Sequence, residues 1–257
     1  MVGFDALIFD VDGTLADTER DGHRVAFNRA FAEAGLDWEW SVELYGSLLS
    51  VTGGKERILY YLNEYNTGFD RPADLAGFVG ELHRSKTRHY MALMGAGAIP
   101  LRPGVARLLG EARDSDTRLA IATTTTPENV SALIENTLPD GAMDWFEVIG
   151  AGDIVPHKKP APDIYEWVLR EMRLGAGDVI AFEDSAHGVS SAMGAGIDRV
   201  VVTVNGYTAG QDFSAASVVL NTLGDAAVSA QAIAGPLPSN GLVDLPFLAS
   251  LPGRVSG

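Results

Sequence analysis

The chain has 257 residues, 46% of them apolar and 21% charged, which is ordinary for a globular protein with one large domain or two smaller ones. Its 34 acidic and 19 basic residues give a formal net charge of −15, so we expect neither nucleic acid nor an anionic membrane as a partner. The absence of cysteine excludes disulfides and thiolate chemistry. We find no membrane-spanning run or signal peptide and expect a cytoplasmic monomer that acts on a small molecule.

Short apolar runs alternate with helical stretches along most of the chain. The first run covers residues 6–9 and stops at the turn residues 10–14. Further runs, which we interpret as strands, cover residues 118–122, 178–182 and 199–204, with a weaker one at 146–149. Helical patterns lie between them at residues 104–112, 127–138, 162–172 and 188–195. This alternation predicts an α/β fold with a doubly wound parallel sheet.

A long segment with a different pattern of apolar residues separates the first two predicted strands. Its apolar residues fall at helical spacing, as in Val25, Phe27, Ala30 and Phe31, and no strong strand pattern is visible. We therefore expect an inserted α-helical cap domain. The predicted organisation is a core of residues 1–16 and 94–225, a cap of residues 17–93, and a C-terminal tail of residues 226–257 to which no chemistry is assigned.

Polar side chains follow four of the predicted strands. Asp10 and Asp12 follow the first, and Thr123 and Thr124 the second. Lys159 comes after the weak strand, and Glu183 and Asp184 follow the run at 178–182. Because ligands of open α/β sheets bind at the carboxyl ends of the strands, these groups are expected to meet at one edge.

Each cluster also has a structural explanation that involves no catalysis. An Asp-x-Asp pair occurs in ordinary turns, and a loop lysine such as Lys159 is usually solvated. Thr126 before Pro127 is typical of a helix start, and Asp184-Ser185 is another helix-capping pattern. The order of all four clusters, each close to a strand end, favours an active site instead.

These groups suit phosphoryl transfer. Asp10 would attack phosphorus to form an aspartyl-phosphate, and Asp12 would act as general acid and then as general base. Thr123 would hold phosphoryl oxygens near a helix N-terminus, and Lys159 would neutralise developing charge. Carboxylate oxygens are preferred ligands of Mg²⁺, so we expect a magnesium site at Asp10, Asp12, Glu183 and Asp184.

The residues Asp10-Val-Asp-Gly-Thr14, Thr123, Lys159-Pro-Ala-Pro-Asp163 and Glu183-Asp184 resemble the motifs of the haloacid-dehalogenase-like hydrolases. The resemblance spans residues 4–206 and implies a Rossmann-like core with a helical cap. A nearer likeness, to the CbbY-type phosphatases beside the β-phosphoglucomutases, lies in residues 17–23, 53–57 and 83–90. That branch is associated with hydrolysis of sugar bisphosphates, notably xylulose 1,5-bisphosphate, which block Rubisco in the Calvin cycle.

The resemblance also indicates which cap residues contact the substrate. Lys55 and Lys86 are expected to hold its distal end, where a second phosphate would suit their charge. Glu19 and His23 lie just past the first linker and are candidates for sugar hydroxyls. Substrate contacts are further expected from Thr52, Arg57 and Thr124, whereas Arg84 and Arg88 share one helix face that would ordinarily be solvated.

Two other functions remain open. A sugar phosphomutase on the same scaffold would transfer the phosphoryl group back to a sugar. His23 is the candidate histidine at the boundary between cap and core. It comes one residue later than the corresponding histidine of β-phosphoglucomutase, with Gly22 at the matching position, which favours the hydrolase. A non-enzymatic phospho-acceptor would also combine aspartates with Thr and Lys, but Asp12 and the large insertion argue against it. Dehalogenation itself needs no metal and is the least favoured activity.

Overall fold

The computed structural model describes residues 3–51 and 53–253. The chain divides into two compact units, a core of Met1–Asp17 with Pro100–Gly257 and a cap of Thr18–Ile99. The cap therefore starts at Thr18 rather than at residue 17, and ends at Ile99 rather than at residue 93. Its end lies later because the last cap helix continues to Gly95 and because Ile99, 1% exposed, packs on Gly22 within the cap.

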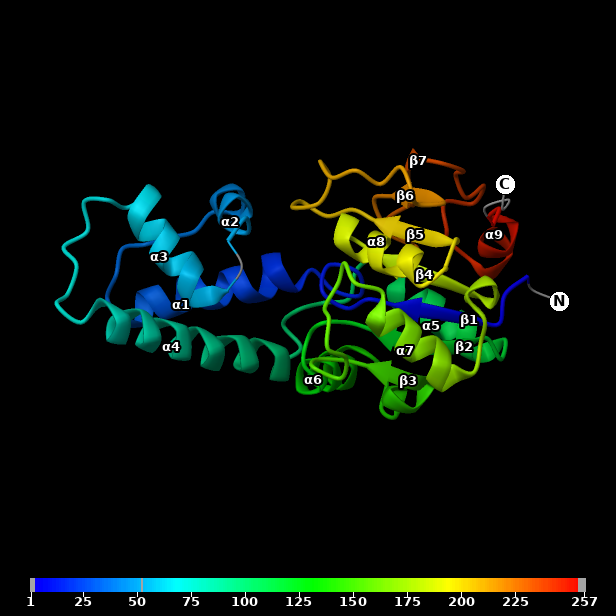
Figure 1. Cartoon of the computed structure of the whole chain (residues 1–257), viewed down its shortest axis with the longest axis horizontal. Coiled ribbons are helices and arrows are strands. Elements are labelled where there is room, and N and C mark those ends of the chain that lie inside the picture. The colour runs from blue at the N-terminus through cyan, green and yellow to red at the C-terminus, as the bar shows by residue number, and fades with distance from the viewer. Residues whose placement is uncertain (1–2, 52, 254–257) are drawn as a thin grey trace. The chain divides into compact units, whose positions relative to one another are not determined.

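The core is built on a seven-stranded sheet in the order β3-β2-β1-β4-β5-β6-β7 (Figure 1). The first six strands are parallel and β7 runs antiparallel to β6. The strands cover Ala6–Phe9 (β1), Arg118–Ala122 (β2), Phe146–Gly150 (β3), Val179–Glu183 (β4), Val200–Thr203 (β5), Val218–Leu220 (β6) and Ala232–Ala234 (β7). This is the predicted Rossmann-like sheet, since β1, β2, β4 and β5 are short apolar strands buried on both faces.

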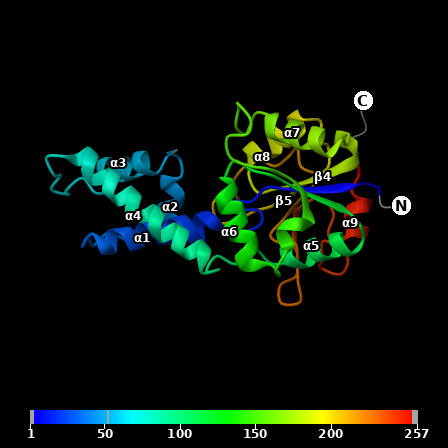
Figure 2. The same cartoon turned by 90° about the horizontal axis from the view of Figure 1, so that it is seen from below.

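Helices cover both faces of the sheet. Figure 2 shows α7 and α8 on one face and α5 and α9 on the other. The core helices are α5 (Val105–Asp114), α6 (Pro127–Thr137), α7 (Asp163–Met172), α8 (Ala186–Gly194) and α9 (Leu245–Ser250), with short 3₁₀ turns η2 (Ala142–Trp145) and η3 (Ala176–Asp178). The face under α7 and α8 is filled by small strand residues such as Ala6, Ala120 and Ala181, which leave room for the bulkier helix residues Tyr165 and Val168.

Residues 226–257 were expected to form a separate tail, but the part of this segment that the structure describes, residues 226–253, belongs to the core unit. Strand β7 pairs with β6 and extends the sheet, and α9 contacts α5. Val243 and Leu248 are fully buried, so the segment contributes apolar side chains to the core. Burial of this surface is the physical reason that the segment packs against the sheet.

The cap consists of helices around an aromatic core. It begins with a π-helix, η1 (Thr18–His23), followed by α1 (Arg24–Glu33), α2 (Val42–Leu48), α3 (Gly54–Glu64) and α4 (Leu75–Gly95). Trp40 is fully buried and its ring lies 4.7 Å from Phe27 and 4.9 Å from Phe31. Helix α3 buries Ile58 and Tyr61. The helical pattern predicted in the insertion is therefore present, and aromatic packing holds it together.

Two chain segments join the core to the cap, and both are tied to the core edge. Ala16 forms an antiparallel bridge with Leu101, and Arg102 donates its backbone N–H to the carbonyl of Leu15 at 2.8 Å. The half-buried Arg102 guanidinium also donates to backbone carbonyls at Gly13, Thr203, Val204 and Asn221. The outgoing and returning segments are thus fixed side by side. In the described ranges 3–51 and 53–253, no helix has both the length and the hydropathy needed to cross a bilayer.

Candidate active site

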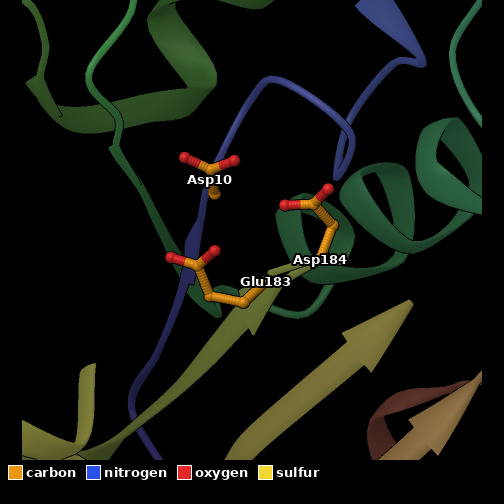
Figure 3. Close-up of side chains that lie close together, drawn as sticks. All are labelled: Asp10, Glu183 and Asp184. Atoms are coloured by element: carbon orange, nitrogen blue, oxygen red, sulfur yellow. The ribbon is translucent and has the colours of Figure 1, made fainter. Parts of the chain in front are cut away.

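Three carboxylates meet at the carboxyl ends of β1 and β4. Asp10 directly follows β1, Glu183 ends β4, and Asp184 comes next. Pairing of β1 with β4 sets these residues beside one another, and Asp10 donates its backbone N–H to Phe182 at 3.0 Å. Figure 3 shows the carboxylates facing a common space. One oxygen from each lies within 4.8 Å of the others, an arrangement that can hold a metal ion.

The burial of this acidic group is only partly compensated by protein contacts. Glu183 is 1% exposed, and its Oε2 has no hydrogen-bond partner among the described residues. Burial raises the pKa of Glu183 to about 7, the ammonium of Lys159 opposing the rise and the carboxylate of Asp10 adding to it. Burial, and then repulsion from Asp10 and Glu183, raises the pKa of Asp184 well above its ordinary value. A divalent cation with oxygen ligands fits this site.

Lys159 links the first strand to the fourth. Its Nζ lies 2.7 Å from Asp10 Oδ1 and 2.6 Å from Glu183 Oε1, and its side chain is 8% exposed. Burial alone would lower the pKa of Lys159, but attraction to Asp10 and Glu183 more than offsets this effect and raises it. The ammonium therefore stays charged beside the carboxylate of Asp10.

Two neutral side chains that the sequence analysis did not identify also touch the carboxylates. The hydroxyl of Tyr165 donates to Glu183 Oε1 at 2.6 Å, and Asn205 Nδ2 donates to Asp184 Oδ2 at 2.7 Å. Asn205 lies just past β5, so the strand-end argument used for the other site residues also applies to it. Tyr165 does not follow a strand, and a tyrosine on the buried face of a helix usually fills the core, so nothing in the sequence indicated a role in the site.

Two glycines make room for the acidic group. Gly13 adopts a φ of +85°, and a Cβ there would lie 2.1 Å from Asp184 Oδ2. A Cβ at Gly188 would lie 1.8 Å from Glu183 Oε2. Both distances are far below van der Waals contact, so close approach of the carboxylates to the backbone requires glycine at these positions.

A cavity of about 330 Å³ opens beside the carboxylates. Asp12 and Thr124 line it, as predicted for groups at these strand ends. Asp12 is not part of the three-carboxylate group among the described residues. Thr123 is 1% exposed, and its hydroxyl accepts the N–H of Thr125 at 3.3 Å. The full lining is Asp10, Asp12, Thr124, Lys158, Lys159, Glu183, Asp184, Ser185 and His187.

Two of the motifs contain helix caps, as their alternative structural explanations predicted. Thr126 caps α6, its side chain accepting the N–H of Asn129 at 3.4 Å, with Pro127 in the first turn. Ser185 caps α8 by accepting the N–H of Gly188 at 3.1 Å. These caps fix the starts of the helices that follow β2 and β4, next to the residues that line the cavity.

Comparison with known proteins decides the family. Residues 4–196 match the sequence pattern of the haloacid dehalogenase-like hydrolases. The chain belongs to this hydrolase family. It is 50% identical to protein CbbY of Rhodobacter capsulatus over 225 residues, which cover 88% of this chain and 96% of that protein.

Solved structures agree with this assignment. CbbY from Rhodobacter sphaeroides in complex with phosphate is 45% identical, with a TM-score of 0.69 over 85% of this chain and 94% of that one. A CbbY variant from the same organism, in complex with xylulose-(1,5)bisphosphate, is 44% identical, with a TM-score of 0.70 over 87% and 98% of the two chains. A putative β-phosphoglucomutase from Thermotoga maritima is 27% identical, with a TM-score of 0.64 over 82% and 89%.

The cap of this haloacid dehalogenase-like hydrolase contains a second group of ionisable residues, which we call the cap cluster: His23, Lys55, Arg57, His83 and Lys86. Lys86 Nζ lies 3.0 Å from His23 Nδ1. Burial, then the charges of Lys86 and Arg57, lowers the pKa of His23 well below its ordinary value. His23 is therefore neutral, and Lys86 donates to its Nδ1, which leaves the proton on Nε2.

The other cap residues predicted to contact substrate differ in exposure. Arg57 is 9% exposed and donates to the hydroxyl of Tyr45 at 2.7 Å, and that hydroxyl donates to Glu19 Oε2 at 2.6 Å. Lys55 is exposed on the first turn of α3. Thr52 lies outside the described residues. Outside the cap cluster, Arg84 pairs with Glu81 and Arg88 pairs with Glu33 at 3.0 Å, both as exposed ion pairs.

Proposed function

We propose that the protein is a Mg²⁺-dependent phosphatase that hydrolyses a sugar bisphosphate, with xylulose 1,5-bisphosphate as the expected substrate, through an aspartyl-phosphate on Asp10. The observation that carries the proposal is the bridge of Lys159 between Asp10 and Glu183, within a group of three buried carboxylates whose charge is only partly compensated. The likeness to CbbY, including a solved complex with this bisphosphate, supports the choice of substrate.

In the first half of the reaction, a carboxylate oxygen of Asp10 attacks phosphorus and the bond to the sugar oxygen breaks. Asp12, which lines the same cavity, gives its proton to the leaving oxygen. Lys159 stays charged and offsets the repulsion between Asp10 and the incoming phosphate. Thr123 already accepts a backbone N–H through its hydroxyl oxygen, so its own proton can be donated to a phosphoryl oxygen.

In the second half, the deprotonated Asp12 takes a proton from water as the water attacks phosphorus. The bond to Asp10 breaks, and inorganic phosphate and the free carboxylate are formed. Asp10, Glu183 and Asp184 would hold Mg²⁺, which, when bound, supplies the positive charge that a phosphate dianion requires in this acidic site. The side chains of the core thus account for both proton transfers.

The cap cluster supports a substrate with a second, non-reacting phosphate. Lys55, Arg57 and Lys86 are cations in a chain of strongly negative net charge, and neutral His23 offers an N–H donor beside them. Charge-assisted hydrogen bonds from such groups suit a phosphate, and binding energy from the remote phosphate can be used for catalysis at the reacting one. We therefore propose that the cap cluster recognises the distal phosphate.

Packing at Gly22 favours hydrolysis over the mutase alternative. This position matches that of the histidine at the cap–core boundary of β-phosphoglucomutase. A Cβ at Gly22 would lie 2.6 Å from a methyl carbon of Ile99 and 2.9 Å from the ring of Tyr90. A side chain at this position would have to displace the end of Ile99 and the ring of Tyr90, so the packing in this cap disfavours a histidine in the mutase position.

The direct test is a Mg²⁺-dependent screen of sugar mono- and bisphosphates, including xylulose and ribulose 1,5-bisphosphates, with free phosphate and sugar products both measured. We expect free phosphate, with the highest kcat/KM for xylulose 1,5-bisphosphate. Isomerised sugar phosphate without free phosphate would show a mutase instead. A stable phosphoprotein without turnover would show a phospho-acceptor.

A further inference from the structure

Each carboxylate of the Glu183–Asp184 pair is held by a neutral donor from a distant part of the chain. Tyr165, on α7, donates to Glu183 Oε1 at 2.6 Å, and Asn205, past β5, donates to Asp184 Oδ2 at 2.7 Å. Neither donor lines the cavity described above, so direct contact with a substrate there does not explain these contacts.

Holding one oxygen of a carboxylate fixes the direction of the other, because the group is planar and rigid. Glu183 Oε1 accepts from both Lys159 and Tyr165, while its Oε2 is buried and has no hydrogen-bond partner within the described ranges. Figure 3 shows one oxygen of Asp184 turned toward the other two carboxylates and one turned away. Each residue is thus set in one orientation before a cation arrives.

The two donors are themselves held in place. Tyr165 is fully buried, and its ring lies 5.2 Å from Lys159 Nζ. Asn205 donates its backbone N–H to the Thr208 hydroxyl at 3.1 Å and accepts the N–H of Tyr207 through Oδ1 at 2.9 Å. This leaves Nδ2 directed at Asp184. Rigid supporting residues of this kind orient the groups that bind a metal.

The neutrality of the donors also matters. A lysine or arginine at either position would orient the carboxylate equally well, but it would cancel a negative charge and compete with a cation for the same oxygens. A phenol hydroxyl and an amide orient without neutralising. The acidic group therefore keeps its attraction for a divalent ion.

We propose that Tyr165 and Asn205 are positioning residues of the metal site, which fix the carboxylates of Glu183 and Asp184 in the orientation that binds Mg²⁺. The inference rests on the proposed metal-dependent function. Loss of either donor lets its carboxylate rotate, so metal affinity falls although every metal-binding carboxylate remains.

The test measures metal binding directly in the full-length protein. Mn²⁺ binding is followed by electron paramagnetic resonance, and Mg²⁺ affinity by competition, for wild type, Tyr165→Phe and Asn205→Ala. We expect the Kd for each metal to rise about 10- to 100-fold in both variants, the usual effect of losing such a contact. Ser217→Ala is the control, because the Ser217 hydroxyl accepts the N–H of Val200 and donates to the carbonyl of Asp198, away from both carboxylates and both donors; its affinity should stay at the wild-type value.

Activity gives the second measurement. If the donors position the metal ligands, kcat of both variants recovers at high Mg²⁺ and the KM for substrate is unchanged. Wild-type affinity in both variants, an equal loss in Ser217→Ala, or a kcat deficit that Mg²⁺ does not restore would each overturn the inference. Thermal unfolding in EDTA verifies folding, and Asn205→Ser replaces Asn205→Ala if the latter is unfolded.

Failure of this inference can be told apart from failure of the proposed function. If wild type binds neither Mn²⁺ nor Mg²⁺ and releases no phosphate, the proposed function is wrong. If wild type binds metal and turns over while Tyr165→Phe and Asn205→Ala bind metal as tightly, only the positioning role is wrong.

Discussion

The core site is mainly acidic, whereas the cap cluster is basic. In the core, three carboxylates lie together, two of them pair with one buried ammonium, and burial raises the pKa of Glu183 and Asp184. In the cap, His23 lies beside Lys86, and burial followed by positive charge lowers the pKa of His23. Burial and like charge cause the shifts in both regions, and a ligand of opposite charge would relieve them: a cation in the core and an anion in the cap.

Because the two regions have different proposed roles, substitutions in them should affect activity in different ways. Changes in the core should abolish the chemistry on every substrate. Changes in the cap should alter the preference among substrates while the chemistry is retained.

The largest effect is expected from Asp10→Asn. Loss of the nucleophile should lower kcat by at least about 10⁴-fold, because the amide cannot form the phosphoenzyme. Phosphate release with sugar bisphosphates measures this, and circular dichroism verifies the fold. Asp5→Asn, an exposed change near the other end of the same strand, is the control and should remain active. Substantial Mg²⁺-dependent turnover by Asp10→Asn would rule out Asp10 as nucleophile.

Asp12→Asn should be the next most damaging change. Loss of general acid–base catalysis typically costs about 10²- to 10⁴-fold in rate. With a good leaving group such as p-nitrophenolate, the first step needs no acid, so a burst of nitrophenolate followed by slow turnover is expected. Rapid-quench kinetics measures the burst. A normal steady-state rate with both ester types would remove Asp12 from the mechanism.

Lys55→Ala and Lys86→Ala test the cap. A hydrogen bond to a charged group contributes about 1.5–3 kcal/mol, so KM for bisphosphates should rise roughly 10- to 100-fold. KM for monophosphates should change little, because they lack the distal group. Arg84→Ala is the control, since Arg84 forms an exposed pair with Glu81 outside the cap cluster. Equal losses on both substrate types would contradict the distal-phosphate assignment.

The smallest expected effect is a pH dependence of stability from His23. Its pKa is lower in the folded protein than the ordinary 6.5, so below pH 6.5 the unfolded chain binds a proton that the folded chain does not. Stability from this residue is complete above pH 6.5 and is lost as the pH falls, by up to about 1.4 kcal/mol at pH 5.5. Urea unfolding at pH 7.5 and 5.5 should show this loss in wild type but a smaller one in His23→Asn. Identical pH dependence in the two proteins would show that His23 does not titrate in this way.

Much of the core fold follows from short apolar runs in the sequence. The predicted bounds of β1 and β2 are those observed, and β4 and β5 differ only at their ends. Strands β6 and β7 and helix α9 were not predicted, because segments of three to six residues in an Ala-, Gly- and Pro-rich region carry no periodicity. In the cap, apolar residues follow one another on α3, and the sequence does not show which of them is buried: Leu59 is 36% exposed, whereas its neighbour Ile58 points inward.

In the candidate site, too, only the residues with a local sequence pattern could be predicted. Residue type and position after a strand were enough to select Asp10 and the Glu183–Asp184 pair, because pairing of β1 with β4 brings them together. Lys159 was selected as well, but the loop that follows β3, rather than strand pairing, carries it to Asp10 and Glu183. Tyr165 could not be selected, since its role depends on which way a helix is rotated against the sheet. That rotation is set by packing across the whole core, which the local sequence does not record.

The bridge between Ala16 and Leu101 has a further consequence. Because the chain leaves and re-enters the core at adjacent points, residues 18–99 form an insertion whose ends a short turn could join, as is common for inserted domains. The core would then keep its fold without them. Under the proposed function, a different insertion at the same two positions would change the substrate preference and leave the phosphate chemistry of the core in place.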